Sequence, residues 1–229
     1  MNHITLTKLN YMECARYLGY GQNTPDENVE RLMRECESEI QDYAVPRFVY
    51  RIFDIDIQDA IMLSETDMKL SGNSIKEHLE NCDRLVLLCV TLSDRIDKLI
   101  RKTELKDMAK ALVMDAMAAV AVEQVCDKAE EFIRDEYLKQ YSHAYFTWRF
   151  GFGYGDLPLC EERLALNLLD AGKRIGVYIN DNLIMFPRKT VACIIGISPE
   201  EIKSKKRGCV SCNMRENCKF RLRGERCGF

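Results

Sequence analysis

The sequence predicts an α+β fold, in which a mixed or antiparallel twisted sheet packs against long helices and a small Cys-rich, metal-binding tail follows. Residues 108–125 are apolar on almost every side of a helix, which indicates a buried helix. Arg84–Leu92 is a nearly continuous apolar run, typical of a central strand covered on both faces. Strand-like and helix-like segments follow one another without regular alternation, and this favours α+β over a parallel sheet.

Composition supports a globular chain with one core and an appendage. Of its 229 residues, 47% are hydrophobic and 30% are charged. We expect one domain over residues 1–200 and a tail over residues 201–229. Residues 203–229 carry nine Lys/Arg and two acidic residues, a charge of +7, whereas the rest of the chain carries −10. No apolar run is long enough to span a membrane, and the first ten residues lack a basic flank before an apolar stretch, so we expect a cytoplasmic protein without a membrane partner.

The first half of the chain predicts three helices and three strands. Asn10 with Glu13 resembles a capping box for a short helix ending near Gly19, and Thr24 with Glu27 predicts the cap of a longer one that ends before Pro46. Another short helix opens at Ser74. The predicted strands are Phe48–Ile57, which alternates apolar and polar residues, the segment Ala60–Ser64, and Arg84–Leu92.

The second half predicts one long helix over residues 103–139, opening on Thr103. The aromatic segment Tyr141–Phe150 predicts a strand, with Phe146 and Trp148 on one face and Arg149 on the other. The remaining expected elements are a helix over Leu159–Ala171, strands over Arg174–Ile179 and Thr190–Ile197, and a short helix opened by Ser198–Glu201.

The segment Arg149–Leu159 (RFGFGYGDLPL) has the composition of a small-ligand loop. Arg149 can hold a carboxylate through two parallel hydrogen bonds. Gly151 and Gly153 lack a Cβ, so the backbone there can approach a ligand closely, and Tyr154 adds a flat ring with a hydroxyl. The spacing is not the dinucleotide-binding G-x-G-x-x-G, and a plain Gly-rich turn is the alternative interpretation. On the predicted buried helix, the carboxylate of Glu123 calls for a partner or a ligand, unless it lies on a polar edge of that helix.

Four cysteines crowd the tail. Cys209, Cys212, Cys218 and Cys227 have the spacing C-x2-C-x5-C-x8-C, which suits four thiolates around one metal centre. The spacing matches neither a standard zinc finger nor the ferredoxin run; we favour a [4Fe–4S] cluster over zinc. The surrounding basic residues would serve a negatively charged cluster, nucleic acid or an acidic partner, or form solvated surface. The other seven cysteines lie among apolar neighbours, and we expect them to be buried.

At these residues the chain resembles a known family. Arg149-x-x-x-Gly153-Tyr154 is similar to the R-x-x-x-G-Y motif of the activation domain of cobalamin-dependent methionine synthase, and Met185–Val191 (MFPRKTV) is similar to the M-x-P-x-x-S-V segment of that domain. The resemblance covers about residues 5–200. It suggests a stand-alone form of the domain, carrying a four-Cys tail that the domain of the large enzyme lacks.

The resemblance implies that S-adenosylmethionine is the ligand. By position, Arg149 would bind its carboxylate, Gly151 would supply backbone contacts, Gly153 would shape the turn and Tyr154 would pack at the ligand. Glu123 would match a helical Glu that contacts the amino group.

The function so implied is that of an accessory, reactivating component of a methyltransferase rather than a self-contained catalyst. Its partner would be a cobalamin-binding methionine synthase or another corrinoid protein, on which reductive methylation of cob(II)alamin occurs, with an electron donor such as flavodoxin or ferredoxin. Two alternatives remain: an iron–sulfur redox activator of a corrinoid protein and, less favoured, a nucleic-acid-binding module built on a zinc tail.

Overall fold

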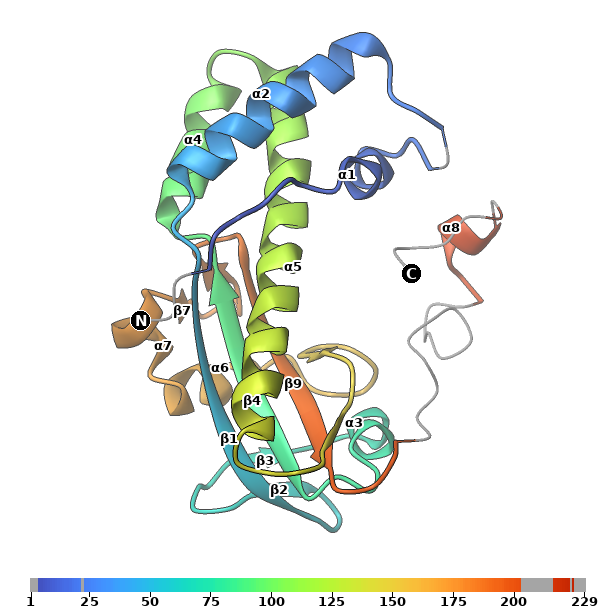
Figure 1. Cartoon of the computed structure of the whole chain (residues 1–229), viewed down its shortest axis with the longest axis vertical. Helices are drawn as coiled ribbons and strands as arrows, with labels where there is room; N and C mark the ends of the chain where they lie inside the picture. Colours follow the sequence, from blue (N-terminus) through green and yellow to red (C-terminus); the bar gives the residue numbers. More distant parts are fainter. Residues whose placement is uncertain (1–3, 22, 203–215, 223, 225–229) are drawn as a thin grey trace.

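A computed structural model describes residues 4–21, 23–202, 216–222 and 224 (Figure 1). Its helices are α1 (Tyr11–Tyr17), α2 (Glu27–Tyr43), α3 (Asn73–His78), α4 (Asp94–Glu104), α5 (Met108–Leu138), α6 (Glu161–Leu168), α7 (Ala171–Ile175) and α8 (Lys219–Leu222). Its strands are β1 (Arg47–Ile57), β2 (Ile61–Leu63), β3 (Lys69–Leu70), β4 (Arg84–Thr91), β5 (Tyr145–Phe146), β6 (Phe150–Gly151), β7 (Tyr178–Ile179), β8 (Met185–Phe186) and β9 (Thr190–Ser198).

One sheet organises the described chain. Its strand order is β3-β2-β1-β4-β9-β5, with β6 also paired to β9, and β7 and β8 form a separate hairpin. Every pairing in these sheets is antiparallel. The α+β fold with an antiparallel sheet is therefore confirmed.

The sheet separates two apolar cores. On one face, Val86, Leu88 and Val90 of β4 pack with α1, α2, α4 and α5. On the other face, Leu85, Leu87 and Cys89 of the same strand pack with residues of α3, α6 and α7. Burial of β4 on both faces explains its unbroken apolar sequence.

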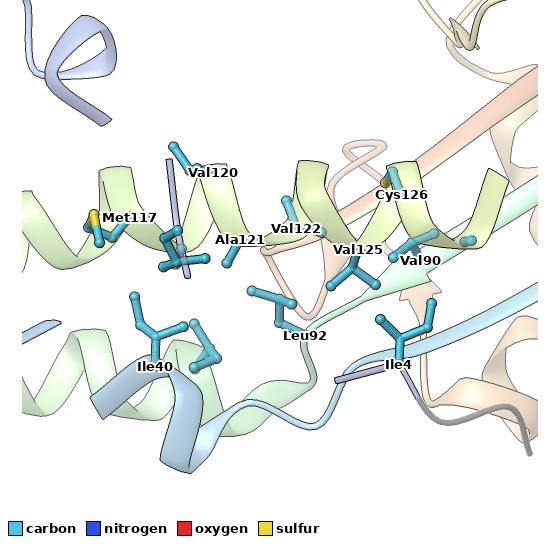
Figure 2. Packing of buried hydrophobic residues seen from close by; sticks show 14 of the residues in the cluster. Ile4, Ile40, Val90, Leu92, Met117, Val120, Ala121, Val122, Val125 and Cys126 are labelled. Atoms are coloured by element: carbon cyan, nitrogen blue, oxygen red, sulfur yellow. The ribbon is translucent and has the colours of Figure 1, made fainter. Parts of the chain in front are cut away.

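The long helix α5 runs along the sheet and joins the elements of the first core (Figure 1). Figure 2 shows its side chains in that core, with Val125 beside Val90 of β4 and Met117 close to Ile40 of α2. The predicted buried helix is confirmed at Met114, Met117 and Val125, which are fully enclosed. It is wrong at the start of α5, where Met108 and Leu112 are exposed.

Several predicted boundaries are wrong. Residues 103–139 do not form one helix, because the chain breaks after Glu104 and Asp107 caps α5 by accepting from the Lys110 N–H. Asp26 rather than Thr24 caps α2, through the N–H groups of Asn28 and Val29. In both cases a carboxylate close to the first helical turn satisfies backbone donors that the helix leaves open.

Some predicted helices and strands in the C-terminal half are also wrong. The segment Arg174–Ile179 is not one strand: Asp170 and Gly176 adopt left-handed backbone conformations around the short helix α7, and only Tyr178–Ile179 is extended. The helix predicted over Leu159–Ala171 is shorter, Glu161–Leu168. The hydroxyl of Ser198 does accept from the Glu200 N–H, but residues 199–202 are not helical.

The predicted tail lies largely outside the described residues. Cys209, Cys212 and Cys227 fall there, so the boundary at residue 200 and the tail's own fold stay predictions. Among the helices that the structure does describe, none combines the length and apolar character needed to cross a bilayer.

Candidate functional site

Arg149 lies in an irregular pairing between the segment 145–151 and β9. Phe146 pairs with Ile197, and Phe150 pairs with Ile194. Four positions therefore separate the two phenylalanines, whereas three separate their partners, so one extra residue is inserted before Phe150. This is a β-bulge, a distortion that changes the direction of side chains and is common beside functional sites.

The bulge corrects the prediction for Tyr141–Phe150. A regular strand would place Phe146 and Trp148 on one face and Arg149 on the other. Instead, Phe146 packs against the core that contains α5, whereas Trp148 packs against the opposite core. Arg149 then points to α5, where its guanidinium meets acidic side chains.

Three carboxylates of α5 surround the Arg149 guanidinium. Its Nη1 donates to Glu130 at 2.9 Å, and its Nη2 lies 2.8 Å from Asp127 Oδ1 and 3.3 Å from Glu123 Oε2. Positions 123, 127 and 130 share one face of the helix, because they are spaced by four and three residues. The Arg149 side chain is only 15% exposed, so these interactions are partly shielded from water.

The structure thus brings Arg149 and Glu123 together, as a shared site requires. The Glu123 side chain is 44% exposed and lies at the edge of the core rather than inside it. Sequence reasoning missed Asp127 and Glu130. Their spacing from Glu123 along one helix face was the available signal, but only the fold shows that Arg149 approaches that face.

The glycines after Arg149 form a tight turn. Gly153 and Gly155 have φ of +79° and +58°, the left-handed region that favours glycine. The ring of Tyr154 lies directly over Gly151, where an added Cβ would come within 2.9 Å of Cδ2. The Tyr154 side chain is otherwise open to solvent, so a flat ring five residues after Arg149 is available to a ligand.

The turn is fastened to α3 by Asp156. Its carboxylate accepts from the N–H groups of Asn73, at 2.7 Å, and Ser74, at 2.8 Å, and these hydrogen bonds lower the pKa of Asp156. The approach is so close that a Cβ on Gly72 would lie 2.7 Å from Asp156 Oδ1. The loop is therefore held in place from a distant part of the chain.

Buried hydrogen bonds of Thr147 hold the bulge against the sheet and against α3. Thr147 Oγ1 lies 2.8 Å from Nε2 of the buried His78 and accepts from the Gly196 N–H at 2.7 Å. Burial lowers the pKa of His78 to about 4, so the imidazole is neutral at physiological pH. The ring also packs against Trp148 and Phe150, the residues that flank Arg149.

The N-terminal helix α1 contributes an aromatic group near the acidic face. Burial and the charge of Glu123 raise the pKa of Tyr17. The Arg16 guanidinium lies 4.5 Å from the centre of the Tyr17 ring. Glu123 thus interacts with Arg149 directly and, through its charge, with Tyr17 of α1.

The segment Met185–Val191 lies elsewhere along α5. Lys189 Nζ binds both the carboxylate and the carbonyl of Asp115, at 2.9 Å each. Asp115 precedes Glu123 by eight residues, about 12 Å along a helix axis. Through Lys189, the segment therefore anchors the start of β9 to a part of α5 that is distant from Glu123.

The described cysteines show no thiolate centre. Burial raises the pKa of Cys193 to about 12 and that of Cys126 well above its ordinary value, so both remain thiols near Arg149. Six of the seven cysteines expected in the core are buried, but Cys160 is exposed. Cys218 is the one predicted metal ligand that the structure describes, and no group of three metal-binding side chains occurs within the described ranges.

Comparison with known proteins gives matches among solved structures, and these concern the fold. No protein-family model matches the chain, and no curated protein sequence does. A crystal structure of the MetH reactivation domain bound to AdoHcy is similar, with a TM-score of 0.65 and 16% sequence identity. The match covers 86% of this chain and 76% of the other. The chain described here therefore has the same fold as that reactivation domain.

Proposed function

We propose that this chain binds S-adenosylmethionine, or its demethylated product S-adenosylhomocysteine, at the turn Arg149–Tyr154 and the facing side of α5. The observation that carries the proposal is the pairing of Arg149 with Glu123 in a fold that it shares with a domain bound to AdoHcy. The proposed ligand carries a carboxylate, which suits the guanidinium of Arg149, and an ammonium group, which suits the carboxylate of Glu123. Cation and anion already lie within hydrogen-bond distance of each other here.

The surrounding residues fit the rest of such a ligand. Tyr154 offers an open aromatic face, and its ring lies over Gly151, whose small size lets a ligand approach the backbone. The bulge at Trp148–Arg149 and the Asp156 anchor hold these groups without help from the ligand. Preformed geometry of this kind lowers the entropic cost of binding.

Calorimetry with purified protein tests this binding. We expect wild type to bind S-adenosylmethionine or S-adenosylhomocysteine, and Arg149→Ala to lose binding at least tenfold, because a partly buried charged hydrogen bond contributes about 1.5–3 kcal/mol. Arg31→Ala is the control, since Arg31 forms an exposed ion pair with Glu35 on α2. Loss of binding in both variants, or in neither, would contradict the assignment.

The finer proposal is that the bound ligand serves a corrinoid partner, by analogy with a reactivation domain. S-adenosylmethionine would supply the methyl group, and the residues of this chain would bind and orient it. Partners would be a cobalamin-binding methionine synthase or related protein and an electron donor. Adding the chain with S-adenosylmethionine and a reductant to the inactive cob(II)alamin form of that protein should restore its methylated state; Arg149→Ala should not.

A second proposal concerns Cys209, Cys212, Cys218 and Cys227, whose sequence spacing supports a metal centre. An iron–sulfur cluster there would make the chain a redox activator of a corrinoid protein, and the two functions are compatible. Anaerobic purification followed by metal analysis and an absorption spectrum separates the choices. Iron with inorganic sulfide supports the cluster, and a colourless protein with one zinc per chain would exclude it.

A further inference from the structure

In the structure, one nitrogen of the guanidinium that is proposed to bind the ligand, Nη2, already faces two carboxylates. A terminal guanidinium nitrogen carries two N–H groups, and Nη2 of Arg149 faces both Asp127 and Glu123. Nη1 is held by Glu130. A carboxylate that binds Arg149 through Nη2 must therefore replace one of the protein's own carboxylates.

The three partners differ in how firmly they are held. Glu130 is 19% exposed and also pairs with Arg134 at 3.1 Å, so it is fixed by two cations. Asp127 is 64% exposed, and Arg149 is the cation that it contacts. An exposed carboxylate on a short side chain exchanges its partner at the lowest cost, because water solvates it as it leaves.

We propose that Asp127 is an exchangeable internal partner of Arg149, which the ligand's carboxylate displaces from Nη2 and which then turns, with Glu123, to accept the ligand's ammonium group. This inference rests on the proposed function, and it adds to that function an explanation of selectivity. The site would admit an α-amino acid head group and disfavour a ligand that carries a carboxylate alone.

The charge balance of the cluster gives the physical reason. Glu123, Asp127 and Glu130 bring three negative charges to Arg149 and Arg134, which leaves one in excess. A ligand with a carboxylate and no ammonium group would add a second excess negative charge beside Arg149, where the charges are partly shielded from water. A zwitterionic head group adds none and gives the displaced Asp127 carboxylate a new partner.

The substitution Asp127→Asn tests the exchange, because asparagine keeps the shape and removes the competing charge. Glu131→Gln is the matched control, since it removes one charge from an exposed position of the same helix. The two probes are S-adenosylhomocysteine and its analogue lacking the amino group, each titrated by calorimetry into wild type and both variants. Thermal melts confirm that the variants are folded.

We expect wild type to prefer S-adenosylhomocysteine over the deaminated analogue. In Asp127→Asn, the affinity for the deaminated analogue should rise about two- to fivefold relative to Glu131→Gln, because the loss of one exposed ion pair changes an equilibrium constant by about this factor. The affinity for S-adenosylhomocysteine should not rise, so the ratio of the affinities for S-adenosylhomocysteine and the deaminated analogue should fall in Asp127→Asn.

An unchanged preference in Asp127→Asn would overturn the exchange while leaving the proposed binding site intact. Equal binding of the two probes by wild type would overturn it too. If wild type binds neither probe, the proposed function fails, and the exchange fails with it.

Discussion

The buried carboxyl of Glu162 should make the stability of the protein depend on pH. This residue is the second of α6 and is 5% exposed, on the face of the sheet where α6 packs and where its charge raises the pKa of Cys89 of β4. Burial raises the pKa of Glu162 from 4.5 to about 7. Substitution by glutamine keeps the shape and removes the charge, so Glu162→Gln isolates the energetic cost of ionising the group in the folded protein.

The direction of the pH dependence follows from the pKa values of Glu162 in the folded and unfolded states. The pKa of Glu162 is higher in the folded protein than in the unfolded chain, so its contribution to stability is complete below pH 4.5 and is lost as the pH rises through 7. A difference of this size corresponds to about 3 kcal/mol at ~1.36 kcal/mol per pH unit, and about 2.5 kcal/mol of it falls between pH 5 and pH 8. Wild type should lose that amount, and Glu162→Gln should not.

Denaturant unfolding of both proteins at pH 5 and pH 8 measures the effect. The free-energy difference between Glu162→Gln and wild type should shift by about 2.5 kcal/mol in favour of the variant at pH 8. Glu77→Gln, at an exposed position of α3, is the control and should show little shift. Equal pH dependence of Glu162→Gln and wild type would refute the claim that this carboxyl is buried in the fold.

Three further predictions follow from the residues around Arg149. The pKa of His78 is lowered to about 4, so its contribution to stability is complete above pH 6.5 and lost as the pH falls through 4; wild type should lose about 3 kcal/mol over that window, and His78→Gln should not. Gly151→Ala should displace the Tyr154 ring and weaken binding of S-adenosylhomocysteine, measured by calorimetry, with the melting temperature nearly unchanged because that ring is exposed. Asp156→Ala removes the acceptor for two N–H groups of α3, so the melting temperature should fall and the affinity with it; unchanged values for both would show that the anchor is dispensable.

The elements that sequence reasoning predicted best are those whose own residues determine them. β4 is apolar along its length because both faces are covered, and the apolar stretch of α5 is buried against the sheet, so each has a local signature. The motif around Arg149 also lies in one short segment. Its glycines adopt left-handed conformations at Gly153 and Gly155, as their composition suggests.

The features that sequence reasoning missed depend on distant parts of the chain. The bulge before Phe150 exists only relative to β9, some 45 residues later, and a single extra residue moves Arg149 to the α5 face. Asp127 and Glu130 look like ordinary solvent-facing acids until that strand is in place. Helix α4 was not predicted, and the start of α5 was placed too early, at Thr103, because residues 103–107 contain no glycine or proline and only Asp107 marks the true start.

We propose that Arg149 holds the carboxylate of S-adenosylhomocysteine or S-adenosylmethionine. A crystal structure of the protein grown with S-adenosylhomocysteine tests this assignment, because it locates the ligand's carboxylate. We predict that this carboxylate lies within hydrogen-bond distance of Arg149 Nη2, with the ligand's amino group facing Glu123 and Asp127. A ligand bound elsewhere, with Arg149 still paired to all three carboxylates of α5, would show that Arg149 does not bind the ligand.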